Sequence, residues 1–188
     1  ILIALRIKGE GEAEMRGFYQ AMQARMMTLR APASRPMPVV LPSYNGARRQ
    51  GNLTPLLALL LNQLGFPVLM HGVSDDATRV TSEAVFAELG VQPVTTQSQA
   101  QACLDNGKLA FITIDNLCPP MAKQLSLRWR MGVRNSAHTL AKLATPFGER
   151  EALRLSSVSH PEYVPRVGQF FSDINAPALL LNGTEGEV

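Results

Sequence analysis

The sequence predicts an α/β protein with a doubly wound, largely parallel sheet flanked by helices. The first observation is a strand, loop, helix and strand unit in residues 39–72, which has the order of a βαβ crossover. The second is that apolar runs of strand length alternate with helical segments through the rest of the chain. The chain has 188 residues, 46% of them hydrophobic, so it is long enough to bury one core of this kind.

The unit at residues 39–72 organises the prediction. Val39–Leu41 is a short apolar run that suits a buried parallel strand. Thr54 offers a hydroxyl group as a helix cap, and Pro55 fits the first helical position. The leucine-rich helix that follows is apolar nearly all round, so we expect it to be buried and to end at Gly65. Residues 67–70 then form the second strand.

The other elements follow from periodicity, capping residues and turn residues. We expect further helices over residues 12–26, 81–89, 97–105, 121–131, 135–143 and 161–171, and further strands over residues 91–95, 111–114, 153–158 and 178–181. The helix at 12–26 carries a stripe of methionine and aromatic side chains: Met15, Phe18, Tyr19, Met22 and Met26. Core packing explains this stripe better than a cofactor site does. Residues 31–38 contain three prolines and are expected to form a stiff linker.

Composition limits the classes of function. The net charge of +3 and the pI near 9.1 permit a polyanionic partner without requiring one. Cys103 and Cys118 fit no zinc pattern and are too few for a secreted disulfide scaffold, so we expect a cytoplasmic protein. The apolar run at residues 53–61 is too short to span a membrane, and no membrane partner is expected. The chain begins inside an apolar segment without methionine, as a fragment would.

Two segments, 43–52 and 71–76, follow the carboxyl ends of predicted strands. Such ends gather ligands in parallel sheets, so both segments should face one crevice. The candidate phosphate and crevice residues are Asn45, Gly46, Asn52, Thr54, His71 and Gly72. In the same loop Tyr44, Arg48 and Arg49 suit a nucleic-acid strand, through stacking and phosphate contacts. An ordinary exposed loop, a plain helix cap at Thr54 and a structural His71 are the alternatives.

A basic cluster lies at Arg128, Arg130 and Arg134. If the helix continues, Arg130 and Arg134 share one face. Lys142 and His138, one turn apart on the next predicted helix, extend the basic strip. Salt bridges and a solvated helix face explain the same pattern, and an arginine suits a carboxylate and a phosphate equally well.

The chain resembles the anthranilate phosphoribosyltransferases of the nucleoside phosphorylase–phosphoribosyltransferase superfamily (glycosyltransferase family 3). The matching segments, in family order, are residues 4–10, 52–54, 70–72, 88–90, 119–121, 132–134, 160–162 and 183–186. The string at 134–143, RNSAHTLAKL, is most similar to the YbiB-type subgroup. That subgroup binds nucleic acid without sequence preference and has no established transferase reaction.

The resemblance implies a domain plan. Residues 1–30 would be the remnant of a small all-helical N-terminal domain that makes a homodimer, residues 31–38 the linker, and residues 39–188 the phosphoribosyltransferase-like domain, truncated at its C-terminus. Arg128 falls where the family places an arginine that binds anthranilate.

The chain also departs from the family's transferases at their phosphate and magnesium motifs. Where they carry G-T-G-G-D, it reads Ser43-Tyr44-Asn45-Gly46-Ala47, and where they carry K-H-G-N-R, it keeps only His71 and Gly72. Val188 stands where the first residue of their magnesium-binding Asp-Glu pair would fall. We therefore predict no catalytic residue, no metal ligand and no cofactor.

The main functional hypothesis is a DNA-binding or RNA-binding protein that contacts single-stranded or double-stranded nucleic acid without sequence preference. Its contacts would be Tyr44, Arg48, Arg49, Arg128, Arg130, Arg134 and Lys142. The alternative is a magnesium-dependent phosphoribosyltransferase that transfers ribose 5-phosphate from phosphoribosyl diphosphate to an unidentified acceptor. A third reading is a dimeric scaffold that uses the helical segment alone.

Overall fold

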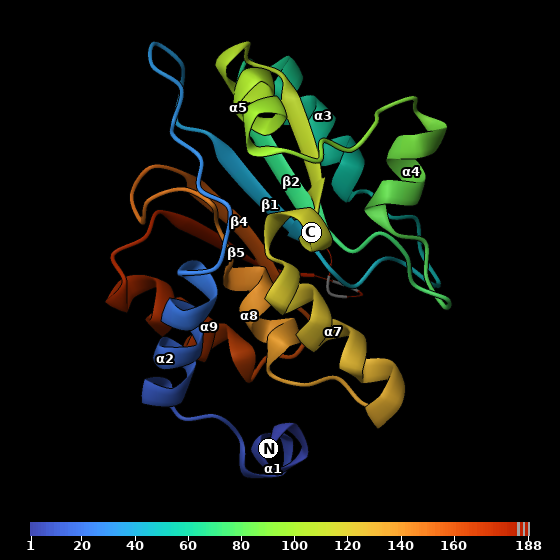
Figure 1. The fold of residues 1–188 in the computed structure, drawn as a ribbon, viewed down its shortest axis with the longest axis vertical. Coiled ribbons are helices and arrows are strands. Elements are labelled where there is room, and N and C mark those ends of the chain that lie inside the picture. The colour runs from blue at the N-terminus through green and yellow to red at the C-terminus, as the bar shows by residue number, and fades with distance from the viewer. Residues whose placement is uncertain (184, 186, 188) are drawn as a thin grey trace.

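The computed structural model describes residues 1–183, 185 and 187. Within them, five parallel strands form one sheet in the order β3-β2-β1-β4-β5 (Figure 1). The strands are β1 (Val39–Ser43), β2 (Val68–Gly72), β3 (Leu109–Thr113), β4 (Leu153–Val158) and β5 (Ala178–Asn182). The predicted parallel α/β sheet is confirmed.

Helices cover both faces of this sheet. They are α1 (Leu2–Lys8), α2 (Glu12–Gln23), α3 (Thr54–Gln63), α4 (Ser82–Glu88), α5 (Gln97–Asp105), α6 (Ile114–Leu117), α7 (Pro119–Met131), α8 (Ala137–Leu143) and α9 (Tyr163–Asp173). In Figure 1, α3 lies behind the sheet, while α2, α7 and α8 lie in front of it. Among the described residues, the buried apolar side chains form two clusters. The larger one includes residues of α2, α5, α7, α8 and α9, and the smaller one includes residues of α3 and α4.

The central βαβ unit forms as predicted, with differences at its helix start. β1 and β2 pair in register from Val39 with Val68 to Ser43 with Gly72. Pro42 lies beyond the two residues of β1 that pair with β4, so its missing N–H group removes no bond to that strand. Thr54 makes no side-chain cap, since the residue at the cap position is Leu53.

The prediction that α3 is buried is wrong for one of its faces. Ala58 is fully buried against the sheet, but Leu56 is 51% exposed and Leu60 is 54% exposed. A helix in a doubly wound sheet needs only one apolar face for the sheet, and no other described element covers the outer face of α3. The left-handed Gly65 (φ 96°) follows the helix as expected.

The predicted strand at residues 91–95 does not form. This segment makes a single bridge, between Val94 and Ile112 of β3. Pro93 lies in its middle and lacks the N–H group that a strand ladder needs. The neighbouring helix α5 does form, because Thr96 and Gln99 cap its first turn reciprocally.

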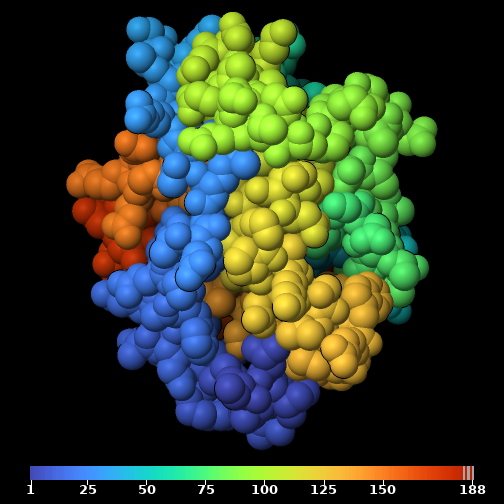
Figure 2. All heavy atoms as spheres, in the orientation of Figure 1, coloured from blue at the N-terminus to red at the C-terminus, as the bar shows by residue number. Residues whose placement is uncertain are grey.

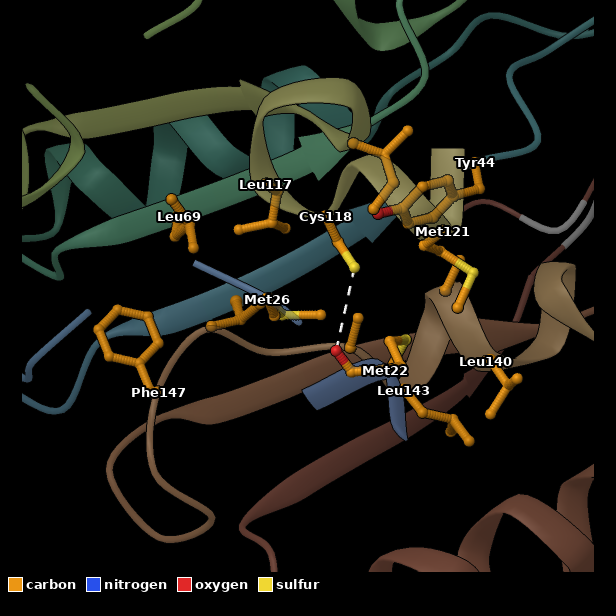
Figure 3. Packing of buried hydrophobic residues seen from close by; sticks show 14 of the residues in the cluster. Met22, Met26, Tyr44, Leu69, Leu117, Cys118, Met121, Leu140, Leu143 and Phe147 are labelled. Atoms are coloured by element: carbon orange, nitrogen blue, oxygen red, sulfur yellow. Dashed lines mark hydrogen bonds between the residues drawn. The ribbon is translucent and has the colours of Figure 1, made fainter. Parts of the chain in front are cut away.

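The N-terminal segment packs against the sheet domain. Tyr19, Met22 and Met26 are buried, which confirms packing as the role of the predicted stripe. Figure 3 shows Met22 and Met26 among side chains from α6, α7 and α8, with the thiol of Cys118 3.9 Å from the carbonyl oxygen of Met22. In Figure 2 the blue N-terminal segment lies against the yellow and gold segment that contains α7. The homodimer and the domain boundaries stay predictions.

No described helix combines the length and the apolar character that crossing a membrane requires.

A substitution at Gly72 tests how closely β1 and β2 approach each other. A Cβ atom at this position would lie 2.1 Å from the carbonyl oxygen of Ser43. We expect Gly72→Ala to lower the free energy of unfolding by at least about 2 kcal/mol, because two paired strands must separate. Urea denaturation of the full-length protein measures this.

The matched control is Gly17→Ala on α2, where an added Cβ meets nothing within 4 Å. This change should raise the free energy of unfolding by about 0.5–1 kcal/mol, because alanine favours the helix. Equal effects of the two substitutions would contradict the close approach.

Candidate functional site

The carboxyl ends of the strands bring the predicted loops together. Ser43, the last residue of β1, pairs with Gly72, the last residue of β2. The loop after β1 continues with Asn45 and Gly46, and Gly46 has a left-handed backbone (φ 61°). A Cβ atom on Gly46 would lie 2.7 Å from the carbonyl oxygen of Val80, so only glycine fits this turn.

The backbone N–H groups of this loop bind a carboxylate from the same chain. The N–H groups of Asn45 and Gly46 donate to Oε1 of Glu187 over 2.6 and 2.8 Å. The hydroxyl of Thr54, at the start of α3, donates to the other oxygen of Glu187 over 3.5 Å. Glu187 is buried, with 6% of its surface exposed. The loop is therefore an anion-binding nest that already holds an anion.

A second carboxylate binds the next part of the loop. The N–H groups of Arg48 and Arg49 donate to Glu185 over 2.6 and 3.2 Å. These bonds lower the pKa of Glu185, because they favour the charged form. The arginine side chains themselves remain exposed. Neither glutamate was predicted as a ligand of this loop, because each lies far from it in the sequence.

Asn52 and Thr54 hold the local structure. The amide of Asn52 donates to Ser82 over 3.1 Å, and its oxygen accepts the N–H group of Thr54 over 3.3 Å. Their contacts are thus made within the protein and fix the entry into α3.

Tyr44 and His71 form a buried pair. The Tyr44 hydroxyl and Nδ1 of His71 are 2.6 Å apart, and Nε2 of His71 lies 3.2 Å from the carbonyl oxygen of Ala144. Because a carbonyl only accepts, Nε2 carries the proton and Nδ1 accepts from Tyr44. Burial lowers the pKa of His71 to about 4, so the ring is neutral. Tyr44 is 2% exposed and offers no ring face to a nucleic-acid base.

The predicted arginine cluster is divided. Gly132 ends α7 in the left-handed conformation, so Arg134 lies beyond the helix and does not share a face with Arg130 as predicted. Arg130 is exposed. Arg128 pairs with Asp76 over 2.8 Å and stacks on Trp129, 4.4 Å from the ring centroid. Burial alone would raise the pKa of Asp76, but bonds from Thr78 and Arg128 outweigh it and lower that pKa.

Arg134 lies in a different environment from the other arginines. Burial lowers the pKa of its guanidinium to about 10, with smaller contributions from Arg128 and Arg79. Its Nη2 atom is buried and has no hydrogen-bond partner among the described residues. A buried guanidinium group with an unused donor is costly, and an anion would remove that cost.

Arg134 lines a basic cavity of about 270 Å³ between α8 and the ends of β1 and β4. The polar or charged residues of its lining are Arg6, Asn45, Arg134, Asn135, His138, Thr139, Lys142, Ser156, Ser159, His160 and Tyr163. None of the described lining residues is acidic. Burial lowers the pKa of Lys142 to about 8 and that of His138 to about 4. Lys142 also donates to the carbonyl oxygen of Ser157 over 2.8 Å.

The sequence analysis missed His160 and Arg6 as cavity residues. The sequence could have predicted His160, because this residue comes just after the predicted strand at 153–158. The loop at 43–52 comes just after β1 in the same way. Arg6 had no such signal, since only the packing of α1 brings it near.

Potential metal ligands do not cluster among the described residues. None of them form a group of three or more histidine, cysteine or acidic side chains that could hold a metal ion. The carboxylates of Glu185 and Glu187 accept backbone N–H groups instead. The predicted mismatch at Val188 and the motif residue Gly186 lie outside the described residues.

The buried His71 predicts a dependence of stability on pH. Above pH 6.5 the ring is neutral in the folded and unfolded states, and as the pH falls toward 4 only the unfolded state takes up the proton. The free energy of unfolding should therefore fall across this window, with about 3 kcal/mol of the loss due to His71.

Urea denaturation at several pH values compares the wild type with His71→Gln, which should flatten this part of the profile. The matched control, His160→Gln, changes an exposed histidine and should keep the wild-type profile. An unchanged profile in His71→Gln would refute the buried neutral ring.

Comparisons with known proteins match this fold. No protein-family model matches the chain. The chain is 66% identical to the protein YbiB of Escherichia coli K12 over 188 residues, which are 100% of this chain and 59% of that protein. It is 26% identical to an anthranilate phosphoribosyltransferase of Thermomicrobium roseum over 187 residues, 99% of this chain and 53% of that enzyme.

Solved structures give the same result. Anthranilate phosphoribosyltransferase (TrpD) from Thermus thermophilus superposes with a TM-score of 0.79 at 24% identity, over 100% of this chain and 56% of that one. The Saccharomyces cerevisiae enzyme in complex with PRPP and Mg has a TM-score of 0.76 at 18% identity, over 99% of this chain and 52% of that one. The chain thus spans somewhat more than half the length of these relatives. It has the fold of the anthranilate phosphoribosyltransferases, and its sequence is similar to that of YbiB.

Proposed function

We propose that the basic cavity binds a small phosphorylated anion of the phosphoribosyl diphosphate class. Arg134, Lys142 and Arg6 supply positive charge to its lining, and the described lining contains no acid. Asn45 connects the cavity to the loop after β1. The ligand class is supported by the yeast relative, which was solved in complex with PRPP and Mg.

The observation that carries this proposal is the unpaired Nη2 of Arg134. Its guanidinium is partly buried beside other cations, which lowers its pKa to about 10. An anion that accepted a hydrogen bond from Nη2 would remove the cost of leaving this donor buried and unpaired. A phosphate offers several oxygens to a guanidinium fork and fits this need.

The reaction class that we propose is the transfer of ribose 5-phosphate to an unidentified acceptor. It rests on the fold and on the named relatives. Among the described residues no cluster of three or more potential metal ligands is present, so the roles that follow are those of side chains alone. In this chain Arg134 would bind the phosphate group, and Lys142 would add charge beside it.

Calorimetric titration of the full-length protein with phosphoribosyl diphosphate, with and without Mg²⁺, tests the proposal. We expect Arg134→Ala to weaken binding by about tenfold or more, because a charge-assisted contact is lost. Arg130→Ala, the matched control on the exposed end of α7, should change the affinity by less than about twofold. Absence of binding to the wild type, or equal effects of both substitutions, would overturn the proposal.

A second candidate function is nucleic-acid binding without sequence preference. The exposed side chains of Arg48, Arg49 and Arg130 favour it, because phosphate contacts need accessible cations. Four of the predicted contacts do not support it in this conformation. Tyr44 is buried, Arg128 is paired with Asp76, and Arg134 and Lys142 line the cavity.

Fluorescence anisotropy of a labelled single-stranded oligonucleotide tests this candidate with the full-length protein. Binding should weaken steeply between about 50 and about 200 mM salt, and Arg48→Ala/Arg49→Ala should reduce both the affinity and the salt dependence. The control pair is Arg35→Ala/Arg150→Ala. It removes the same amount of positive charge from residues that precede β1 and β4, and so lie near the amino ends of these strands. If both pairs behave alike, the loop after β1 is not the nucleic-acid interface.

A further inference from the structure

The loop after β1 is built to hold an anion and is filled by its own chain. Asn45 and Gly46 present adjacent N–H groups, and Thr54 adds a hydroxyl from the first turn of α3. All three donate to one carboxylate, that of Glu187. Phosphate oxygens and carboxylate oxygens use the same donors, so only one of them can occupy this position at a time.

The Glu187 carboxylate also lies beside the cations of the basic cavity. Its charge raises the pKa of Lys142 and of Arg134 against the effect of burial. It therefore neutralises part of the positive field that a phosphorylated ligand would otherwise meet. Asn45 belongs both to the loop and to the cavity lining, which makes the two sites continuous.

We propose that Glu187 is an internal competitor for phosphate, and that its carboxylate must leave the loop after β1 before a ligand phosphate can bind there. This inference rests on the proposed anion-binding function. Glu185 contributes in the same way, because its carboxylate accepts the N–H groups of Arg48 and Arg49. The carboxylates of Glu185 and Glu187 thus occupy the N–H groups that a ligand phosphate would need.

The residue that follows β5 offers an independent way to displace the Glu187 carboxylate. Gly183 follows β5 and donates to the carbonyl oxygen of Val158 over 3.0 Å. A Cβ atom on Gly183 would lie 2.1 Å from the carbonyl oxygen of Glu187. Gly183→Ala therefore displaces Glu187 without changing a donor of the loop or a cation of the cavity.

The test is calorimetric titration of the full-length protein with inorganic pyrophosphate in buffer free of divalent cations. Glu187→Gln keeps the shape of the side chain and removes its charge. We expect it to bind pyrophosphate about tenfold more tightly than the wild type, and Gly183→Ala to shift the affinity in the same direction. Glu88→Gln, which removes an equal charge from the exposed end of α4, should match the wild type.

The outcomes separate this inference from the proposed function. If Glu187→Gln and Gly183→Ala bind no more tightly than the wild type while Arg134→Ala still weakens binding, Glu187 is only a structural cap and the competition is refuted. If none of the proteins binds pyrophosphate, both the proposed competition and the proposed anion site are refuted. A purely structural Glu187 would lower the stability of the variants without raising their affinity, and thermal unfolding of each variant measures that stability.

Discussion

The structure around the site depends on one requirement, which is that the buried N–H groups after β1 must find an acceptor. Asn45 is 4% exposed, so water cannot serve its N–H group freely. In the parallel sheet β1 lies between β2 and β4, so this loop lies beside the ends of those two strands. The chain later returns through β5 and brings Glu187 to the loop. The acceptor comes from a residue that is distant in sequence, and a loop that could bind a ligand is closed by the protein itself.

Burial also determines the charges of the side chains near this loop. His71 and His138 are held neutral by burial, whereas Arg134 and Lys142 remain cations with lowered pKa values. A cavity with positive charge and without a described acid in its lining favours anions. Glu187 offsets part of that charge from outside the lining. The balance between this glutamate and an incoming anion is what would set the affinity of the site.

The sequence predicted the features that depend on local pattern. The βαβ unit at 39–72, the helix at 97–105 and the strand at 153–158 follow from periodicity and flanking residues, and all form. The strand at 91–95 fails because Pro93 prevents a full ladder, which the alternation of apolar residues concealed.

The site was less predictable, because it depends on contacts between distant segments. The strand-end rule placed the loop after β1 and the end of β2 together, and it would have found His160 if applied to β4. It gave no signal that Tyr44 turns inward to His71, that Asp76 pairs with Arg128, or that Glu187 binds the loop. Each of these pairs joins residues that are more than 25 positions apart.

The most direct test of the central claim is amide hydrogen exchange of the full-length protein, followed by NMR in buffer free of phosphate. If the carboxylate of Glu187 fills the loop, the N–H groups of Asn45 and Gly46 exchange slowly without any added ligand. Exchange of both groups at the rate of an open, solvated loop would show that the nest is empty and would contradict the account.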